Sequence, residues 1–246
     1  SSFIVVLFYI FSLLLLVTVL QFSPIRAVRS WIVVHTFQFE PSEMAKLVII
    51  ILLAKYFSQK HAEIYRVRHV VASFFYTAIP SALVFIQPDL GSSFVFLGIW
   101  FIVLLAAGIK KQHVVGILIL AILFISVGWI TVLEPYQKNR IVSFLDPFLD
   151  PRGLGYSTIQ SRVAIGSGSI IGKGWGNGTQ SSEGFLPEAH TDYIFASFAE
   201  QFGLLGVAGL MSLVFMLVWR IAYICGRANN NFSKLFGVGF ISLLGT

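Results

Sequence analysis

Titratable side chains gather in one short segment of the sequence, residues 186–193. Glu188, His190 and Asp192 alternate there with small residues, immediately before a long apolar stretch. A carboxylate at a membrane surface, partly removed from water and near another acid and an imidazole, can accept a proton from an attacking hydroxyl group. Asp near a helix start also caps the free N–H groups of the first turn. The spacing leaves both roles open for Asp192.

A second charged group lies at residues 40–46. Pro41 suits the first turn of a helix, and Glu43 and Lys46 are then neighbours at a spacing of three. An ordinary helical ion pair explains them. Lys46, however, falls inside an apolar segment, and ionisable side chains inside a membrane are candidates for function. Glu43 and Lys46 are therefore candidate substrate-binding residues.

Several cations occur in or near the polar segment 134–192. They are Lys138, Arg140, Arg152, Arg162 and Lys173. Such groups suit the oxygens of a diphosphate, and the guanidinium group can bind two oxygens at once. A basic patch that contacts lipid headgroups explains them equally well. Lys138 and Arg140, which stand closest together, are the candidates for binding substrate.

Glu200 is an acid in an unfavourable place. It lies eight residues beyond Asp192 in the same expected helix, ~12 Å further along its axis. An unpaired carboxylate is costly inside a membrane, so Glu200 needs a partner or a polar cavity.

No cofactor follows from the sequence. The histidines are scattered and Cys225 is the single cysteine, so no spacing indicates a His/Cys metal site or an internal disulfide. A divalent cation held by carboxylates, magnesium or manganese, stays open. The glycine-rich stretch 166–174 lacks the spacing of a phosphate-binding loop, which argues against nucleotides. Trp31 fits an aromatic belt at the membrane interface or, as the alternative, a contact to a sugar ring.

The composition excludes a soluble globular domain. Of the 246 residues, 57% are hydrophobic and 11% are charged, against about 25% charged in soluble domains. Several uncharged runs are long enough to cross a ~30 Å hydrocarbon core. We expect an all-α polytopic membrane protein, a multi-helix bundle forming one domain over residues 1–246, with helices at about 1–20, 42–59, 69–88, 90–109, 114–133, 193–219 and a truncated 233–246. The first residue is not Met, which suggests a fragment.

Charge distribution predicts the orientation. If the turn after the first helix is exterior, the interior loops carry many basic residues and one acid, Glu63, whereas charges on the other side are balanced. The positive-inside rule then places the loop 134–192 on the exterior. Within it, residues 156–171 are typical of a short, weakly amphipathic helix that could lie at the interface.

Several segments together resemble the SEDS family (RodA, FtsW and the sporulation relatives), over about residues 29–206. They include Pro-Ser-Glu at 41–43 with Lys46, Gln-Pro-Asp-Leu-Gly at 87–91, Tyr-Gln-Lys-Asn-Arg at 136–140, Leu-Pro-Glu at 186–188 and Thr-Asp-Tyr-Ile-Phe at 191–195. Gly-Lys-Gly at 172–174 and Gly-Thr-Gln at 178–180 look like RodA rather than FtsW. Glu40, where Gln is usual, and Tyr193, where Phe is usual, depart from the pattern.

The resemblance implies a ten-helix fold, of which this chain would be a fragment. It implies a glycosyltransferase of the bacterial cytoplasmic membrane that polymerises lipid II, a disaccharide-peptide on undecaprenyl diphosphate, for cell elongation and shape. Implied partners are a class B penicillin-binding transpeptidase, elongation-complex membrane proteins and membrane lipids, and no nucleic acid. The family's essential aspartate falls on Asp192, and its functional Glu and Lys fall on Glu43 and Lys46.

Two other functions stay open. A transporter that flips the same lipid needs a polar cavity that opens alternately to both sides, and the expected interior loops offer few acids for coupling. A non-catalytic scaffold for a partner synthase would tolerate replacement of Asp192. The catalytic hypothesis is an inverting reaction in which Asp192 is the general base, with Glu188 and His190 as candidate substrate-binding residues. Lys46, Lys138 or Arg140, or a bound divalent ion, would stabilise the departing diphosphate.

Overall fold

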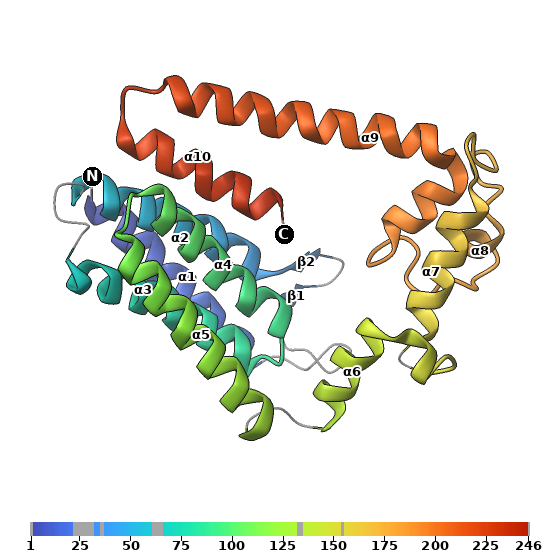
Figure 1. Ribbon diagram of the computed structural model, residues 1–246, viewed down its shortest axis with the longest axis horizontal. Helices are drawn as coiled ribbons and strands as arrows, with labels where there is room; N and C mark the ends of the chain where they lie inside the picture. Colours follow the sequence, from blue (N-terminus) through green and yellow to red (C-terminus); the bar gives the residue numbers. More distant parts are fainter. Residues whose placement is uncertain are drawn as a thin grey trace. The chain divides into compact units, whose positions relative to one another are not determined.

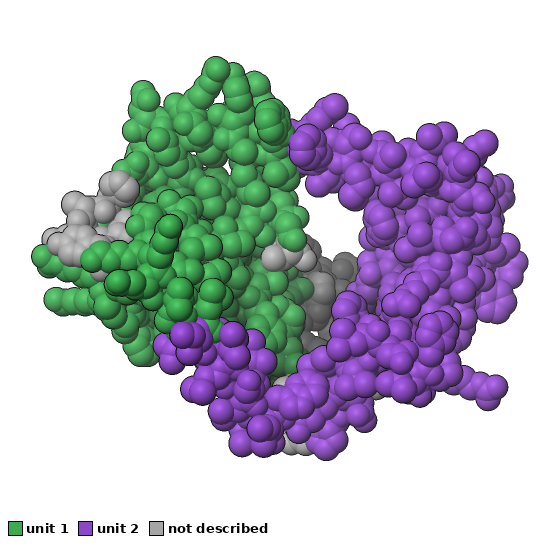
Figure 2. All heavy atoms as spheres, viewed as in Figure 1, with its two compact units in different colours: residues 1–118, 218–246 green, residues 119–217 purple. Residues whose placement is uncertain are grey.

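The computed structural model describes residues 2–21, 32–34, 37–60, 66–131, 135–153 and 155–245. The chain forms two compact units (Figure 2). Unit 1 comprises Ser1–Leu118 and Val218–Thr246, and unit 2 comprises Ile119–Leu217. The boundaries between the units fall inside two long helices rather than in loops.

Unit 1 is a helical bundle built around α2 (Figure 1). Its elements are α1 (Ser2–Val19), β1 (Ile32–Val34), β2 (Phe37–Phe39), α2 (Pro41–Gln59), α3 (Val67–Ile86), α4 (Leu90–Ala106), the start of α5 (Lys111–Thr131), the end of α9 (Ile194–Arg227) and α10 (Asn231–Leu244). Helix α2 contacts α1, α3, α4 and α10. Its apolar side chains are therefore buried on several faces, with Ile50, Leu53 and Phe57 fully enclosed.

Four helices, α1, α3, α5 and α9, are long and apolar enough to cross a membrane, and α4 and α10 are shorter apolar helices. Helix α5 buries none of its residues, as suits a helix whose surface faces lipid. Polar contacts join the bundle: the Ser81 and Ser93 hydroxyls lie 2.8 Å apart between α3 and α4. The expected all-α polytopic fold is confirmed.

One element was not expected from the sequence. Strands β1 and β2 form an antiparallel hairpin in which Val34 pairs with Phe37, and β2 leads directly into α2. This pairing satisfies backbone N–H and C=O groups of residues 32–34 and 37–39.

Unit 2 contains the polar segment and the start of α9. Its other elements are the end of α5, α6 (Pro135–Leu145), the 3₁₀ turn η2 (Pro147–Leu149), α7 (Tyr156–Ser167) and α8 (Thr179–Ser182). Helix α7 confirms the short helix predicted to begin at residue 156, but it ends at Ser167 rather than at 171. Helix α9 is interrupted at Gly203, whose backbone is non-helical with φ 64°.

Candidate functional site

The segment 186–193 forms a turn with one buried side and one exposed side. Leu186 and Ala189 are buried, 2% and 6% exposed, in a small apolar cluster with Ala164 of α7 and Ala196 of α9. The polar side chains between and after them are exposed: Glu188, His190, Thr191 and Asp192. Burial of the apolar pair therefore holds the turn in place and directs its titratable groups outward.

The backbone of Glu188 fixes the shape of this turn. Its φ is 53°, in the left-handed region that non-glycine residues rarely adopt. The Glu188 carbonyl accepts hydrogen bonds from the N–H groups of Thr191 at 3.1 Å and Tyr193 at 3.2 Å. The Thr191 hydroxyl also donates to the Glu188 carboxylate at 3.1 Å. Glu188 thus closes the turn that ends where α9 begins.

Asp192 is presented at the head of α9 without an internal partner. Across residues 155–245, which the structure describes without a gap, its carboxylate accepts no hydrogen bond and forms no ion pair. The side chain therefore does not cap α9. An exposed carboxylate on a fixed turn can accept a hydrogen bond, and then a proton, from a bound hydroxyl.

Glu200 is the polar centre of unit 2. It is fully buried, and its Oε1 accepts from Lys173 Nζ at 2.8 Å and from the Gln180 N–H at 2.9 Å. Its Oε2 accepts from the Ser181 N–H at 3.0 Å and hydroxyl at 2.9 Å. The partner that the sequence required is thus Lys173, whose Nζ also donates to Thr179 Oγ1 at 2.7 Å.

The glycine-rich stretch closes the break in α9. An interrupted helix leaves carbonyl groups unpaired before the break and N–H groups unpaired after it. Backbone hydrogen bonds from the loop satisfy both sets: Lys173 N to Glu200 O (3.0 Å), Gly174 N to Gln201 O (3.0 Å), Leu204 N to Ser169 O (2.9 Å) and Leu205 N to Ile170 O (3.0 Å). The two backbones meet so closely that a Cβ on Gly203 would lie 2.3 Å from Gly172 N.

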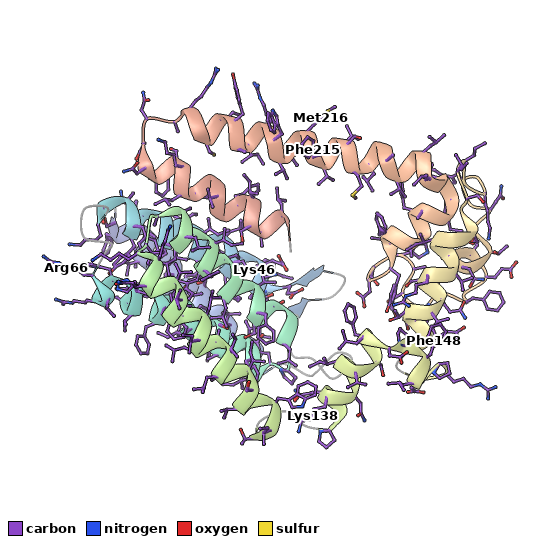
Figure 3. The ribbon with its side chains drawn as sticks, viewed as in Figure 1. Lys46, Arg66, Lys138, Phe148, Phe215 and Met216 are labelled. Carbon is purple, nitrogen blue, oxygen red and sulfur yellow. The ribbon has the colours of Figure 1, made fainter. Side chains whose placement is uncertain are left out.

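In unit 1, Lys46 and Glu43 form an ion pair of 2.6 Å (Figure 3). The Lys46 side chain is 7% exposed and that of Glu43 is 59% exposed, so the pair joins a buried cation to a surface acid. Burial raises the pKa of the nearby Glu40 carboxyl, and the Glu43 and Asp89 carboxylates add to the shift, while a hydrogen bond from Ser42 opposes it. Asp89, from the 87–91 motif, is therefore near enough to the 40–46 group for its charge to act on the Glu40 carboxyl.

The remaining candidates are less defined. Lys138 lies half-buried on α6 and has no hydrogen-bond or ion-pair partner within the described ranges. Arg140 also belongs to α6, but its side chain lies outside the described residues, as does Trp31 altogether. No group of three or more His, Cys, Asp or Glu side chains in the described part of the chain is arranged to hold a metal ion.

Sequence reasoning missed the structural use of two features. It grouped Lys173 with cations for a diphosphate, whereas Glu200 engages its ammonium group. It rejected the glycine stretch as a phosphate loop without finding its actual contact, the break at Gly203. The available signal was the Gly-Lys-Gly and Gly-Thr-Gln motifs, because Lys173, Thr179 and Gln180 within them donate hydrogen bonds to Glu200.

Fold and site together define a polytopic, all-α membrane protein whose polar segment is anchored on a broken helix. The model of the FTSW_RODA_SPOVE family, described as "Cell cycle protein", matches residues 2–246. The chain belongs to this family.

Named relatives agree with this assignment. The chain is 35% identical to peptidoglycan glycosyltransferase MrdB of Escherichia coli over 237 residues, which cover 96% of this chain and 64% of the relative. It is 36% identical to the probable peptidoglycan glycosyltransferase FtsW of Aliivibrio salmonicida, covering 94% of this chain and 57% of that protein. The chain thus spans 64% of the length of the first relative and 57% of the length of the second.

Solved structures show the same fold. A chain from a study of how a peptidoglycan synthase complex coordinates polymerization and crosslinking superposes with a TM-score of 0.81 at 31% identity, covering 99% of this chain and 68% of that one. Rod shape determining protein RodA of Thermus thermophilus superposes with a TM-score of 0.65 at 27% identity, covering 99% of this chain and 63% of that one.

Proposed function

We propose that the full-length protein is a peptidoglycan glycosyltransferase that polymerises lipid II into glycan strands. The names of the relatives support the reaction class. The observation that carries the proposal in this chain is Asp192: an exposed carboxylate with no partner among the described residues, on a turn held by buried Leu186 and Ala189.

In the proposed reaction, a sugar hydroxyl of the acceptor attacks the anomeric carbon of the donor from the face opposite its diphosphate. The new carbon–oxygen bond forms as the bond from that carbon to the diphosphate oxygen breaks, so the configuration inverts. Asp192 takes the hydroxyl proton, and the polyprenyl diphosphate leaves with the bonding electrons. Glu188 and His190, exposed on the same turn, are proposed to orient the acceptor.

Cations would stabilise the charge that develops on the leaving diphosphate. We assign Lys138 of unit 2 to this role because it is half-buried and unpaired within the described residues. We assign Lys46 to substrate binding as well, since its ammonium group is buried and held by Glu43. Arg140 and Trp31 stay in the proposal on the sequence alone.

The proposed location is the bacterial cytoplasmic membrane, with residues 134–192 on the exterior, as the charge distribution predicts. The proposed partners are a class B penicillin-binding transpeptidase and other membrane proteins of cell elongation. The solved relative from a peptidoglycan synthase complex supports a partner of this kind.

The decisive experiment compares wild type, Asp192→Asn and Asp192→Ala in the full-length protein, reconstituted with its transpeptidase and fluorescent lipid II, with moenomycin present to silence classical polymerases. Asp146→Asn is the matched control, because Asp146 is also exposed. Its side chain accepts a hydrogen bond from Phe148 N, and an asparagine side chain can accept the same bond. Glycan strands on a gel are expected from wild type and the control, and none from either Asp192 variant. Full activity of the Asp192 variants would show that Asp192 is not the catalytic base, absence of strands from wild type would favour a scaffold, and lipid II crossing the bilayer without strand formation would favour a transporter.

A further inference from the structure

Two isoleucines form the tip of the glycine-rich loop. Ile170 and Ile171 lie in a turn that is closed by a hydrogen bond of 2.8 Å from the Gly172 N–H to the Gly168 carbonyl. Both side chains are exposed, that of Ile171 to 79%, and residues 166–172 carry no charge. Exposed apolar side chains of this size are unfavourable in water and mark a contact with an apolar environment. The function proposed above gives this loop tip no role.

Backbone hydrogen bonds fix the loop tip beside the part of α9 that follows the break. The N–H groups of Leu204 and Leu205 donate to the carbonyl groups of Ser169 and Ile170 at 2.9 and 3.0 Å. Both leucine side chains are exposed. The loop tip and the first turn of this apolar helix therefore lie at the same level and present one apolar surface.

The apolar helix after the break is short for a membrane crossing. It carries no charged residue from Leu204 to Trp219, and the next residue is Arg220. At ~1.5 Å per residue this stretch is ~24 Å long, whereas the hydrocarbon core of a bilayer is ~30 Å thick. The loop tip lies at the Leu204 end, so it extends the apolar surface where the helix falls short.

Trp175 adds an aromatic side chain typical of a membrane interface. It is 83% exposed, and its ring packs edge-to-face on Phe202 with the ring centroids 5.8 Å apart. Phe202 in turn stacks on Phe198 at 4.6 Å, and both phenylalanines precede the break. Tryptophan is enriched where hydrocarbon meets water, because its ring is apolar and its N–H is polar.

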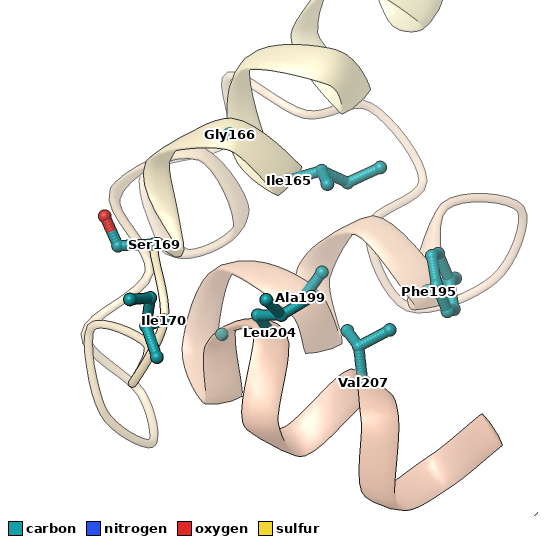
Figure 4. Close-up of a pocket in the computed structure, with 9 residues that line it drawn as sticks. Ile165, Gly166, Ser169, Ile170, Phe195, Ala199, Leu204 and Val207 are labelled. Carbon is teal, nitrogen blue, oxygen red and sulfur yellow. The ribbon is translucent and has the colours of Figure 1, made fainter. Parts of the chain in front are cut away.

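An apolar pocket of about 290 Å³ deepens this surface (Figure 4). Ile170 and Leu204 line the pocket together with Phe195, Ala199 and Val207 of α9. A pocket lined by such side chains offers water few polar partners. Hydrocarbon from the bilayer is therefore a better occupant than water.

The residue types favour lipid over a second membrane helix as the neighbour of this surface. Helices that associate in membranes present small residues, which let the two backbones approach closely, and polar side chains that form hydrogen bonds between them. The loop tip and Trp175 instead present large apolar side chains that protrude. The nearest cation, Lys173, is engaged by Glu200 at 2.8 Å. Acyl chains need neither a close approach nor a polar partner.

We propose that the loop tip and Trp175 insert into the membrane leaflet beside the polar segment and anchor the loop there through phospholipid acyl chains. Lys173 lies between Ile171 and Trp175 in the chain and is bonded to Glu200. The anchor therefore holds the buried Glu200 network at the membrane surface. This proposal does not depend on the reaction proposed above.

The test measures the depth of the loop in a bilayer. Ile171→Cys and Trp175→Cys are made one at a time in a cysteine-free version of the full-length protein, spin-labelled and placed in phospholipid nanodiscs. Collisions with oxygen, which concentrates in hydrocarbon, and with a water-soluble nickel chelate then give the depth of each label. Glu183→Cys, at an exposed residue of the same polar segment, is the reference in water. Phe124→Cys, at a 77% exposed residue of α5, is the reference in lipid.

We expect the label at 171 to lie about 5–10 Å below the headgroups, and the label at 175 to lie nearer to them. Access of nickel to position 171 equal to that at 183 would overturn the proposal. Protection of position 171 from both oxygen and nickel, with or without a bound transpeptidase, would also overturn it, because protein would then cover the loop tip.

A second pair of variants tests whether insertion anchors the loop. Ile171→Glu should move the label at 175 toward water, because a charge on the loop tip opposes insertion. Ile171→Leu, the matched control, should leave the depth of that label unchanged. Equal depth of the label in both variants would refute the anchor.

Both experiments use binding-independent readouts, so their outcome is separate from that of the strand-formation assay.

Discussion

Replacing Glu200 by glutamine tests whether one buried carboxylate holds the polar segment on α9. The substitution keeps the size of the side chain but removes its charge and turns one acceptor oxygen into an NH₂ group. Oε1 accepts hydrogen bonds from Lys173 Nζ and the Gln180 N–H, whereas Oε2 accepts from the N–H and the hydroxyl of Ser181. Whichever oxygen is replaced, a backbone N–H loses its acceptor.

The cost can be added from these contacts. A buried N–H without an acceptor costs about 1–3 kcal/mol, and a hydrogen bond to a charged group contributes about 1.5–3 kcal/mol. Lys173 is 27% exposed, so water recovers part of the second contribution. A total of about 3 kcal/mol corresponds to a roughly 100-fold increase in local opening of the segment.

Hydrogen–deuterium exchange of the full-length protein in detergent measures this opening directly. Peptides covering residues 168–182 should exchange much faster in Glu200→Gln than in wild type, while α2 of unit 1 should not change. Glu183→Gln is the control, because Glu183 is an exposed acid of the same segment. Equal exchange in Glu200→Gln and wild type would refute the assigned role of Glu200.

Three further changes probe other contacts. Glu40→Gln removes a carboxyl whose pKa is raised by burial above 4.5. Because the folded state favours the protonated carboxyl, wild type should lose stability as the pH rises from 4.5 through the raised pKa. The variant should therefore have a higher Tm than wild type at neutral pH, but not below pH 4.5. Gly203→Ala places a Cβ 2.3 Å from Gly172 N and should cost about 1–3 kcal/mol. Gly98→Ala in α4, with no atom within 4 Å, should keep or slightly raise the stability, because alanine favours a helix over glycine. Gln87→Met removes the buried 2.9 Å hydrogen bond to the Leu16 carbonyl and should lower stability by about 1–2 kcal/mol; an unchanged Tm would contradict this.

The helical bundle follows from the sequence because apolar runs of membrane-spanning length have few alternatives in lipid. The break at Gly203 does not. Between residues 194 and 219 the one charged residue is Glu200, and the composition is otherwise typical of a membrane helix. Gly206 and Gly209 follow Gly203 without interrupting the helix, so a glycine alone does not mark the break. The loop that pairs with the broken ends comes from about thirty residues earlier, and no local pattern reports it.

The candidate site shows the same limit. The Glu43–Lys46 pair was predictable because helical spacing alone brings the two side chains together. Lys173 and Glu200 are 27 residues apart, and residue type gave the charge of Lys173 but not its partner. The capping role of Asp192 was plausible from its position, but it depends on where α9 begins, and the turn closed by Glu188 displaces the helix start to Ile194.

The four backbone bonds between the glycine loop and the broken ends of α9 constrain the length of the loop more than its composition. They join main-chain atoms of α9 to main-chain atoms of four loop residues, Ser169, Ile170, Lys173 and Gly174. The exposed side chains of Ile170 and Ile171 can vary without loss of these bonds, whereas a Cβ on Gly172 would lie 2.2 Å from the Gln201 carbonyl oxygen. Deleting or inserting one residue between Ile170 and Lys173 would shift the register, leaving unpaired groups at one end of the break. Over evolution, homologous loops should therefore keep their length and this glycine while the residues at 170 and 171 change among apolar types.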